Sequence, residues 1–228
     1  MTELVSADAG DVSRETCPPA VAVDLLGPAA DRLVPYARLL AGPAIEGGLL
    51  GPRERDRLWE RHLLNCAAVA AALPQGAEVV DVGTGAGLPG LVWALLRPDL
   101  RVTLVDPQLR RTDFLDHALT ELGARSVQVR RARVQELAGE VAADIVAARA
   151  LAPLDRLIEW CLPLVRPGGA LWALKGESAA AEVTAAAGAL QRGGVARTAL
   201  SAYGEGVLEQ PTRVVEVWRP GAGREGGQ

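Results

Sequence analysis

The sequence predicts an α/β fold in which a seven-stranded, mostly parallel sheet carries helices on both faces. From residue 78 onward, short apolar runs alternate with helical stretches, which is the pattern of a parallel sheet with crossover helices. The first apolar run leads directly into a glycine-rich loop. The last two runs, 195–201 and 213–218, have only a loop between them, and strands joined without a crossover helix pair antiparallel. We therefore expect five parallel strands followed by a terminal antiparallel hairpin.

The region before the sheet is predicted to be helical. Its helical stretches are separated by the breaks Gly42-Pro43 and Gly47-Gly48, and the first residues of the chain combine acids, serine, threonine, glycine and proline in a way typical of disorder. The expected organisation is a disordered lead at 1–19, an N-terminal helical cap at 20–75, a main α/β domain at 76–219 and a disordered tail at 220–228.

Within the main domain, each expected strand is a short run rich in valine and other apolar residues, and each expected helix has apolar residues at helical spacing. The second strand ends in Asp106, and the fourth is followed by Arg149. The expected strands are 78–82, 101–105, 126–130, 143–148 and 169–174, and the expected helices are 88–97, 108–123, 134–139, 152–165 and 176–192.

Composition excludes several classes of protein. The chain has 228 residues, of which 49% are hydrophobic, which is enough for one sizeable core. A formal charge of -4 gives no global attraction to nucleic acid, so any such binding needs a local patch. The three cysteines form no CxxC pair, the N-terminus is acidic where a signal peptide is basic, and no run approaches eighteen apolar residues. We expect a soluble, monomeric, cytoplasmic protein with no membrane contact and no metal.

The loop after the first strand is the strongest chemical signal in the chain. It reads Asp81-Val-Gly83-Thr-Gly85-Ala-Gly87-Leu88-Pro-Gly, and alternate glycines let a ligand approach the backbone closely. The stretch from Gly85 onward also satisfies G-x-G-x-x-G, the dinucleotide fingerprint. In that fingerprint, however, the glycines cradle a pyrophosphate, and Pro89 removes a backbone donor that a phosphate would use.

An acid followed by three alternating glycines is instead the arrangement of S-adenosylmethionine-dependent methyltransferases. Asp81 is placed to accept from the amino group of the cofactor, and Asp106, at the end of the second strand, is placed to bind ribose hydroxyls. The sequence therefore favours S-adenosylmethionine over NAD and predicts the Class I methyltransferase fold, which is Rossmann-like. An NAD-binding protein remains an alternative at this point.

The end of the fourth strand indicates the type of methyl acceptor. It lacks the Asn/Asp-Pro-Pro-Tyr motif of enzymes that alkylate exocyclic amines and the Pro-Cys nucleophile of enzymes that alkylate pyrimidine carbon 5, and Cys161 lies in an apolar helical run. It offers a cation, Arg149, which suits an acceptor with a free lone pair, such as guanine N7, because no proton has to be removed. A methyltransferase acting on a small metabolite is the main alternative.

Several cations are candidates for contact with an RNA substrate. Arg61 and His62 belong to a basic stretch in which acids are interleaved, and Arg131 lies near the end of the third strand. Lys175 is the only lysine of the chain, and it precedes Gly176 at the end of the fifth strand, on the same edge as Arg149. We take Arg149 and Lys175 as candidate catalytic residues, and Arg61, His62, Arg131 and Lys175 as candidate RNA-binding residues.

Further motifs follow one another from about residue 55 to residue 180. They are Arg61-His62-Leu63-Leu64, the glycine loop from Asp81 to Gly90, Arg110-Arg111 before Phe114-Leu115, Arg133-Val134-Gln135-Glu136, Arg149-Ala150-Leu151-Ala152 and Ala173-Leu174-Lys175-Gly176.

In these motifs the chain resembles the glucose-inhibited division protein B family, which are guanine-N7 methyltransferases of small-subunit ribosomal RNA. The preference for arginine over lysine is typical of a GC-rich genome, as in an actinobacterial member. The resemblance implies that guanine 527 in the 530 loop of 16S ribosomal RNA is methylated, either in naked RNA or in the small ribosomal subunit. It also implies cofactor contacts at Gly83, Leu88, Val134, Gln135 and Arg149.

Overall fold

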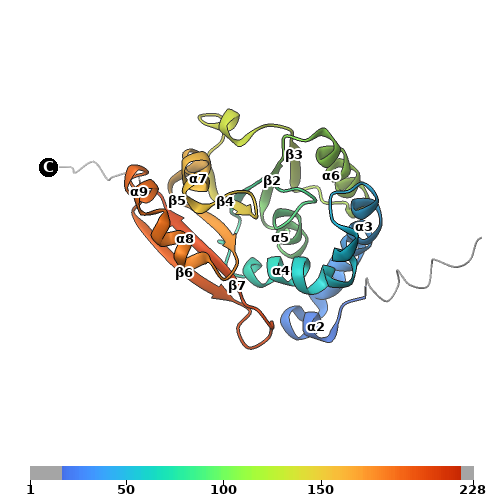
Figure 1. Cartoon of the computed structure of the whole chain (residues 1–228). Helices are drawn as coiled ribbons and strands as arrows, with labels where there is room; N and C mark the ends of the chain where they lie inside the picture. Colours follow the sequence, from blue (N-terminus) through green and yellow to red (C-terminus); the bar gives the residue numbers. More distant parts are fainter. Residues whose placement is uncertain (1–16, 222–228) are drawn as a thin grey trace, which may run out of the picture.

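The structure, a computed structural model, describes residues 17–221 and is built on one seven-stranded sheet (Figure 1). The strand order is β3-β2-β1-β4-β5-β7-β6. The first five strands are parallel, and β7 runs antiparallel to both of its neighbours. The predicted parallel sheet with a terminal antiparallel hairpin is therefore confirmed. The strands are β1 (Glu78–Val82), β2 (Arg101–Val105), β3 (Val127–Arg130), β4 (Ala143–Arg149), β5 (Val165–Lys175), β6 (Arg197–Tyr203) and β7 (Thr212–Trp218).

Helices flank this sheet on both faces. Those before β1 are α2 (Ala20–Leu26), the 3-10 helix η1 (Gly27–Leu33), α3 (Val34–Leu39), the π-helix η2 (Leu40–Ala44), the 3-10 helix η3 (Pro52–Arg57), the π-helix η4 (Leu58–Leu64) and α4 (Asn65–Ala70). Those after it are α5 (Gly90–Leu96), α6 (Leu109–Leu122), the 3-10 helices η5 (Val134–Leu137) and η6 (Leu162–Leu164), α7 (Leu154–Cys161), α8 (Ala179–Ala185) and α9 (Ala187–Arg192).

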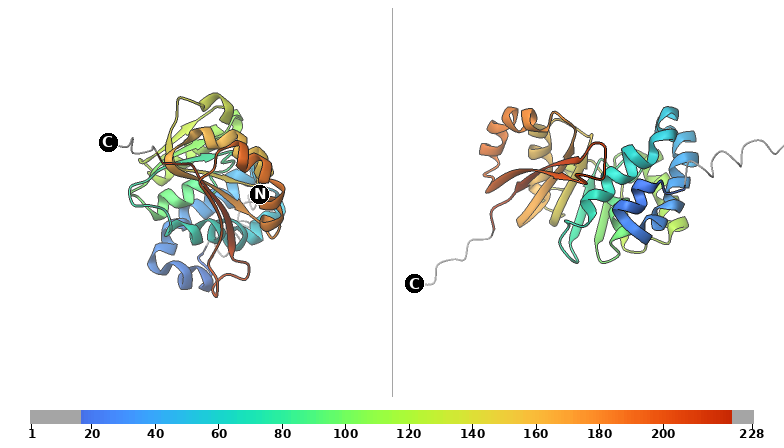
Figure 2. Two further views of the ribbon diagram at one scale, coloured as in Figure 1. Left: turned by 90° about the vertical axis from the view of Figure 1, so that its left-hand side faces the viewer. Right: turned by 90° about the horizontal axis from the view of Figure 1, so that it is seen from below.

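The core has two parts, one on each face of the sheet, because side chains of a strand alternate between its faces. Val79 contributes to the cluster shared with α5, α6 and the helices before β1, whereas Val80 contributes to the cluster under α7, α8 and α9. Figure 2 shows these two helical layers on opposite sides of the strands. The helices before β1 thus bury their apolar side chains in the same cluster as one face of the sheet.

Three expected helices differ from the structure. The stretch 134–139 forms only the single 3-10 turn η5, because the chain turns at Gly139 with a φ of 84°. The stretch 152–165 gives α7 and then η6, since Pro163 interrupts the α-helical bonding and β5 already begins at Val165. The stretch 176–192 is divided into α8 and α9 at Ala186, whose φ of -83° and ψ of 3° depart from helical geometry.

The register of the strands determines which residues meet at the carboxyl edge of the sheet. Val82 is level with Val105 on one side and with Ala148 on the other, and Arg149 is level with Leu174. The glycine loop, Asp106, Arg149 and Lys175 therefore lie at the carboxyl ends of four adjacent strands. Strand order reverses between β1 and β4, and ligands of such sheets bind beside that point.

Two sequence predictions lie largely outside the described residues, namely the lead at 1–19 and the tail at 220–228. Within the described range, no helix is long and apolar enough to span a bilayer.

Candidate cofactor and substrate site

The glycine loop takes a backbone conformation that only glycine adopts readily. Gly83, Gly85 and Gly87 have φ angles of 66°, 61° and 105°. The amides of Gly83 and Thr84 both donate to the carbonyl of Val105, which anchors the loop to β2. A Cβ on Gly87 would lie 2.8 Å from the hydroxyl oxygen of Tyr36 and 3.1 Å from a side-chain carbon of Leu115. The loop is thus held tightly against the body of the protein.

Asp81 is fully buried at the end of β1 and holds the loop together. Its Oδ2 accepts hydrogen bonds from Thr84 Oγ1 at 2.6 Å and from the amide of Gly90 at 2.8 Å. Its Oδ1 is also buried but has no hydrogen-bond partner within the described residues. Burial raises the pKa of Asp81 to about 6. An unpartnered carboxylate oxygen is expensive to bury, so it marks a place for a donor, such as an ammonium group.

Asp106, the acid predicted to bind ribose, is fully buried at the end of β2. Its Oδ1 accepts from the amide of Gln108 at 3.0 Å, and its Oδ2 accepts from the amide of Gly85 at 3.2 Å. Arg111 Nη1 lies 3.0 Å from the same Oδ2, and the Arg111 side chain is 33% exposed. Arg111 is therefore the partly exposed partner of a fully buried carboxylate. The sequence assigned no role to Arg111 itself, although it belongs to one of the motifs.

A shallow hollow lies between the ends of β1, β2 and β3 and the loop after β4. Gly83, Val134 and Gln135, which the sequence predicted to contact the cofactor, line it together, and Leu151 closes one side. The Leu151 side chain packs on Gly83 so closely that a Cβ there would meet Leu151 Cδ1 at 2.6 Å. Leu151 and Trp160 also line the hollow, and the sequence analysis assigned neither of them to the cofactor site. The complete lining is Val82, Gly83, Val105, Pro107, Ala132, Arg133, Val134, Gln135, Leu151 and Trp160.

Arg149, at the end of β4, is connected through His62 to Glu54. Arg149 Nη2 lies 3.3 Å from His62 Nδ1, and His62 Nε2 lies 2.7 Å from Glu54 Oε2. A guanidinium can only donate, so Nδ1 is the acceptor and the proton of the neutral ring is on Nε2, facing Glu54. Burial and the charge of Arg149 lower the pKa of His62, which keeps the ring neutral.

The other predicted RNA-binding residues have different surroundings. Arg131 is exposed after β3, and Arg61 is exposed but lies 3.2 Å from Glu54. His62 is only 8% exposed, behind Arg149. Lys175 Nζ is 2.7 Å from the carbonyl oxygen of Ala152 and 2.7 Å from Glu182 Oε2, so its charge faces protein groups. Arg149 and Lys175 both adjoin the short loop between β4 and α7, residues 150–153. Arg149 precedes this loop, and Lys175 contacts it at Ala152.

These residues fit S-adenosylmethionine. Asp81 has a carboxylate oxygen free for an ammonium group, the glycine loop exposes its backbone, and the hollow offers apolar walls beside Asp106. Leu88, the remaining predicted contact residue, is buried at the start of the turn that leads into α5. No group of three or more metal-ligating side chains occurs among residues 17–221.

Comparison with known proteins also indicates a methyltransferase. Residues 29–210 match the model of a family described as rRNA small subunit methyltransferase G. The chain belongs to this family. Members from Salinispora tropica and Streptomyces coelicolor, both named ribosomal RNA small subunit methyltransferase G, are 52% and 48% identical to it. The alignments cover 90% and 87% of this chain and 88% and 84% of those proteins.

Solved structures confirm the fold that the family shares with other methyltransferases. The S-adenosylmethionine-dependent methyltransferase SibL superimposes with a TM-score of 0.59 at 19% identity, over 92% of this chain and 74% of its own. A Thermotoga maritima O-methyltransferase gives 0.55 at 16% identity, over 72% and 67%. The family and the Class I fold together show that S-adenosylmethionine is the cofactor, and the NAD alternative is set aside.

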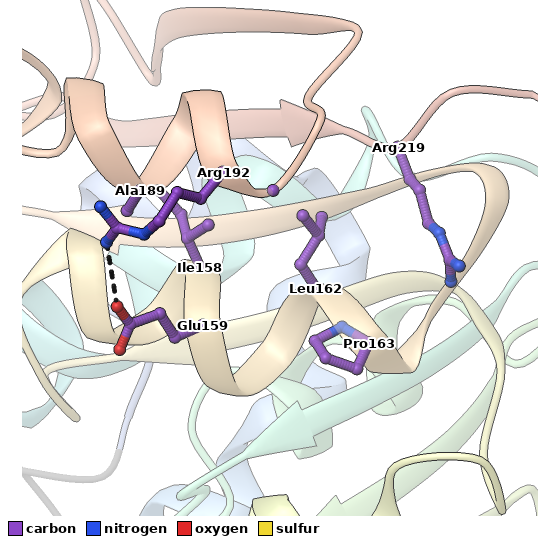
Figure 3. A pocket seen from close by; sticks show the side chains of 8 residues that line it. Ile158, Glu159, Leu162, Pro163, Ala189, Arg192 and Arg219 are labelled. Atoms are coloured by element: carbon purple, nitrogen blue, oxygen red, sulfur yellow. Dashed lines mark hydrogen bonds and ion pairs between the residues drawn. The ribbon is translucent and has the colours of Figure 1, made fainter.

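A second hollow lies between α7 and α9, where Arg192 pairs with Glu159 (Figure 3). It also contains Leu162 and Pro163, which precede β5, so it is at the opposite edge of the sheet from the glycine loop. Its position separates it from the cofactor site.

Proposed function

We propose that this methyltransferase transfers the methyl group to N7 of a guanine in 16S ribosomal RNA. The observation that carries the proposal is the arrangement at the end of β4, where Arg149 is presented beside the glycine loop and both ring nitrogens of His62 are already engaged. His62 therefore has no free lone pair with which to remove a proton. Guanine N7 needs no such base, because its lone pair attacks directly.

The cysteines support the same choice. Burial raises the pKa of Cys66 to about 11 and that of Cys161 to about 12, so both are thiols at neutral pH. Cys161 ends α7 in the core, and Cys66 lies in α4. Neither is suited to form the covalent adduct that methylation of a pyrimidine carbon requires.

Each residue at the edge then has a defined task. Asp81 and Asp106 bind the polar ends of the cofactor, and the hollow beside Val134 and Gln135 accepts its adenine. When bound, S-adenosylmethionine supplies the electrophilic methyl group. Arg149, held by His62, provides a fixed positive charge that orients the substrate and attracts phosphate or the guanine oxygen.

The family name points to the small ribosomal subunit, and the motif resemblance points to guanine 527 in the 530 loop. A bacterial enzyme with this substrate works in the cytoplasm. The test is to incubate the protein and labelled S-adenosylmethionine with small subunits and with naked 16S RNA, both from a strain that lacks the modification. Borohydride and aniline cleave RNA at N7-methylguanosine, and primer extension then locates the cut. Label at another atom of the base, or in a small metabolite alone, would contradict the proposal.

A further inference from the structure

We propose that Lys175 and Glu182 form a clamp that positions the loop between β4 and α7, residues 150–153, and through it the cofactor site. Lys175 Nζ donates to the Ala152 carbonyl at 2.7 Å, and Glu182 Oε2 accepts from both Lys175 Nζ at 2.7 Å and the Leu154 amide at 3.1 Å. One ion pair thus holds the main chain of this loop at two points. The inference rests on the proposed function only for its effect on RNA methylation.

The clamped loop needs such support because its backbone is strained. Ala150 has a φ of 52°, and within residues 17–221 no other non-glycine residue has a positive φ. Such a conformation is unfavourable for a residue with a Cβ and persists only where neighbouring contacts enforce it. The hydrogen bonds to Ala152 and Leu154 lie just beyond the strained residue.

The loop also carries the side chains that shape the site. Arg149 precedes it at the end of β4, and Leu151 covers Gly83 and closes the hollow with Val134 and Gln135. A shift of the loop would displace Leu151 from the glycine loop and change the direction of Arg149 together. The clamp is therefore expected to act on cofactor binding and on turnover.

The clamp is largely shielded by the protein. The Lys175 side chain is 8% exposed and the Glu182 side chain 26%, and Glu182 Oε1 also accepts from Ser178 Oγ at 3.1 Å. Although partial burial alone would raise it, the pKa of Glu182 is lowered by its hydrogen bond and ion pair with Lys175, so the pair is charged at neutral pH. A compact ammonium reaches two oxygens at 2.7 Å here, which a planar guanidinium does not reproduce.

The test compares Lys175→Gln, Lys175→Arg, Glu182→Gln and the pair Lys175→Gln/Glu182→Gln with the parent. Glu177→Gln is the matched control, since Glu177 is exposed two residues after Lys175. Cofactor affinity is measured by calorimetry with S-adenosylhomocysteine, and amide exchange is followed in the peptide that contains 150–154. Both measurements need no RNA, so they test the clamp even if the proposed RNA target is wrong. Turnover on small subunits and the salt dependence of RNA binding are measured in parallel.

We expect each clamp variant, including Lys175→Arg, to lower cofactor affinity by about tenfold and to speed exchange at Leu154, since a charge-assisted hydrogen bond is lost. The loss in the double variant should be smaller than the sum of the losses in the two single variants, because both single variants remove the same ion pair. The salt slope of RNA binding should not change. The proposal is overturned if Glu182→Gln and Lys175→Gln keep parental affinity and exchange. A salt slope reduced by about one unit in Lys175→Gln would then indicate that Lys175 contacts an RNA phosphate instead.

Discussion

The carboxylate oxygens of Asp81 and Asp106 differ in how many hydrogen-bond partners they already have. Asp81 Oδ1 has no partner in the described part of the chain, whereas both oxygens of Asp106 are already engaged by backbone amides and Arg111. The first acid can accept a new donor without losing a bond. The second must share its oxygens with a ribose or release Arg111. The two carboxylates therefore have different expected effects on cofactor binding.

We expect the free oxygen of Asp81 to make cofactor affinity pH-dependent. Its pKa of about 6 in the free protein means that the carboxylate is ionised at pH 7 and protonated at pH 5. A cationic amino group binds only the ionised form, so affinity for S-adenosylhomocysteine should fall by about tenfold between pH 7 and pH 5. Calorimetry across that range measures it, with Asp81→Asn as the control, in which binding should be weak at every pH. The same dependence in Asp81→Asn would assign the titration to another group.

A change of Asp106 tests the ribose contact. In Asp106→Ala the ribose hydroxyls lose their acceptor, and the Gly85 amide loses its partner, so cofactor affinity should fall by at least about 2 kcal/mol. Asp113→Ala is the control, because Asp113 is exposed on α6. Unchanged calorimetric affinity in a folded Asp106→Ala protein would remove Asp106 from the site.

At the scale of elements, the helices before β1 contact the glycine loop directly. Tyr36 of α3 donates from its hydroxyl to the carbonyl of Ala86 at 2.6 Å, and η4 supplies His62 to Arg149. Burial raises the pKa of Tyr36 well above its usual value, so its proton is retained for this bond. These helices thus hold both the glycine loop and the cation at the end of β4.

Replacing this tyrosine should loosen the loop. Tyr36→Phe leaves the Ala86 carbonyl without its donor, which costs about 1–3 kcal/mol when the acceptor stays buried, and we expect part of that loss in cofactor affinity. The chain has one other tyrosine, Tyr203, which donates to Glu216 on β7. Tyr203→Phe is therefore a matched control, expected to lower the melting temperature while leaving affinity for S-adenosylhomocysteine unchanged. Equal affinity losses in the two variants would indicate a general effect on stability.

At the scale of the whole molecule, the proposed guanine N7 acceptor needs only alignment and fixed charge from the enzyme, because its lone pair is already reactive. We expect the single-turnover rate of methyl transfer, at saturating cofactor, to be nearly constant between about pH 6.5 and 8.5, since no group has to lose a proton. His62, with a lowered pKa, stays neutral across this window. Quenched-flow measurement of the single-turnover rate on small subunits, at several pH values, tests this prediction. A rate that rises tenfold per pH unit would instead require a general base and a different acceptor atom.

The sequence is sufficient for what depends on local pattern. Alternating apolar runs predict the sheet, and the ends of those runs place Asp81, Asp106 and Arg149 at one edge. The contacts that shape the site are not visible in the sequence, because they join residues far apart along the chain. Tyr36 and Ala86 are separated by 50 positions, and His62 and Arg149 by 87. Lys175 stands out by its rarity, but only the folded chain shows that Ala152 and Glu182 are its partners.

The hydrogen bonds between α4 and β7 have a consequence for folding during synthesis. Thr212 Oγ1 lies 2.8 Å from the backbone carbonyl of Asn65 and 2.9 Å from its side-chain oxygen, across 147 positions. During synthesis the helices before β1 leave the ribosome well before β7 does. Their apolar side chains therefore stay partly exposed to water until the strands that cover them have been synthesised. Nascent chains arrested before residue 212 should accordingly be held by chaperones and cut readily by protease, and the resistance of this segment should appear only when β7 has emerged.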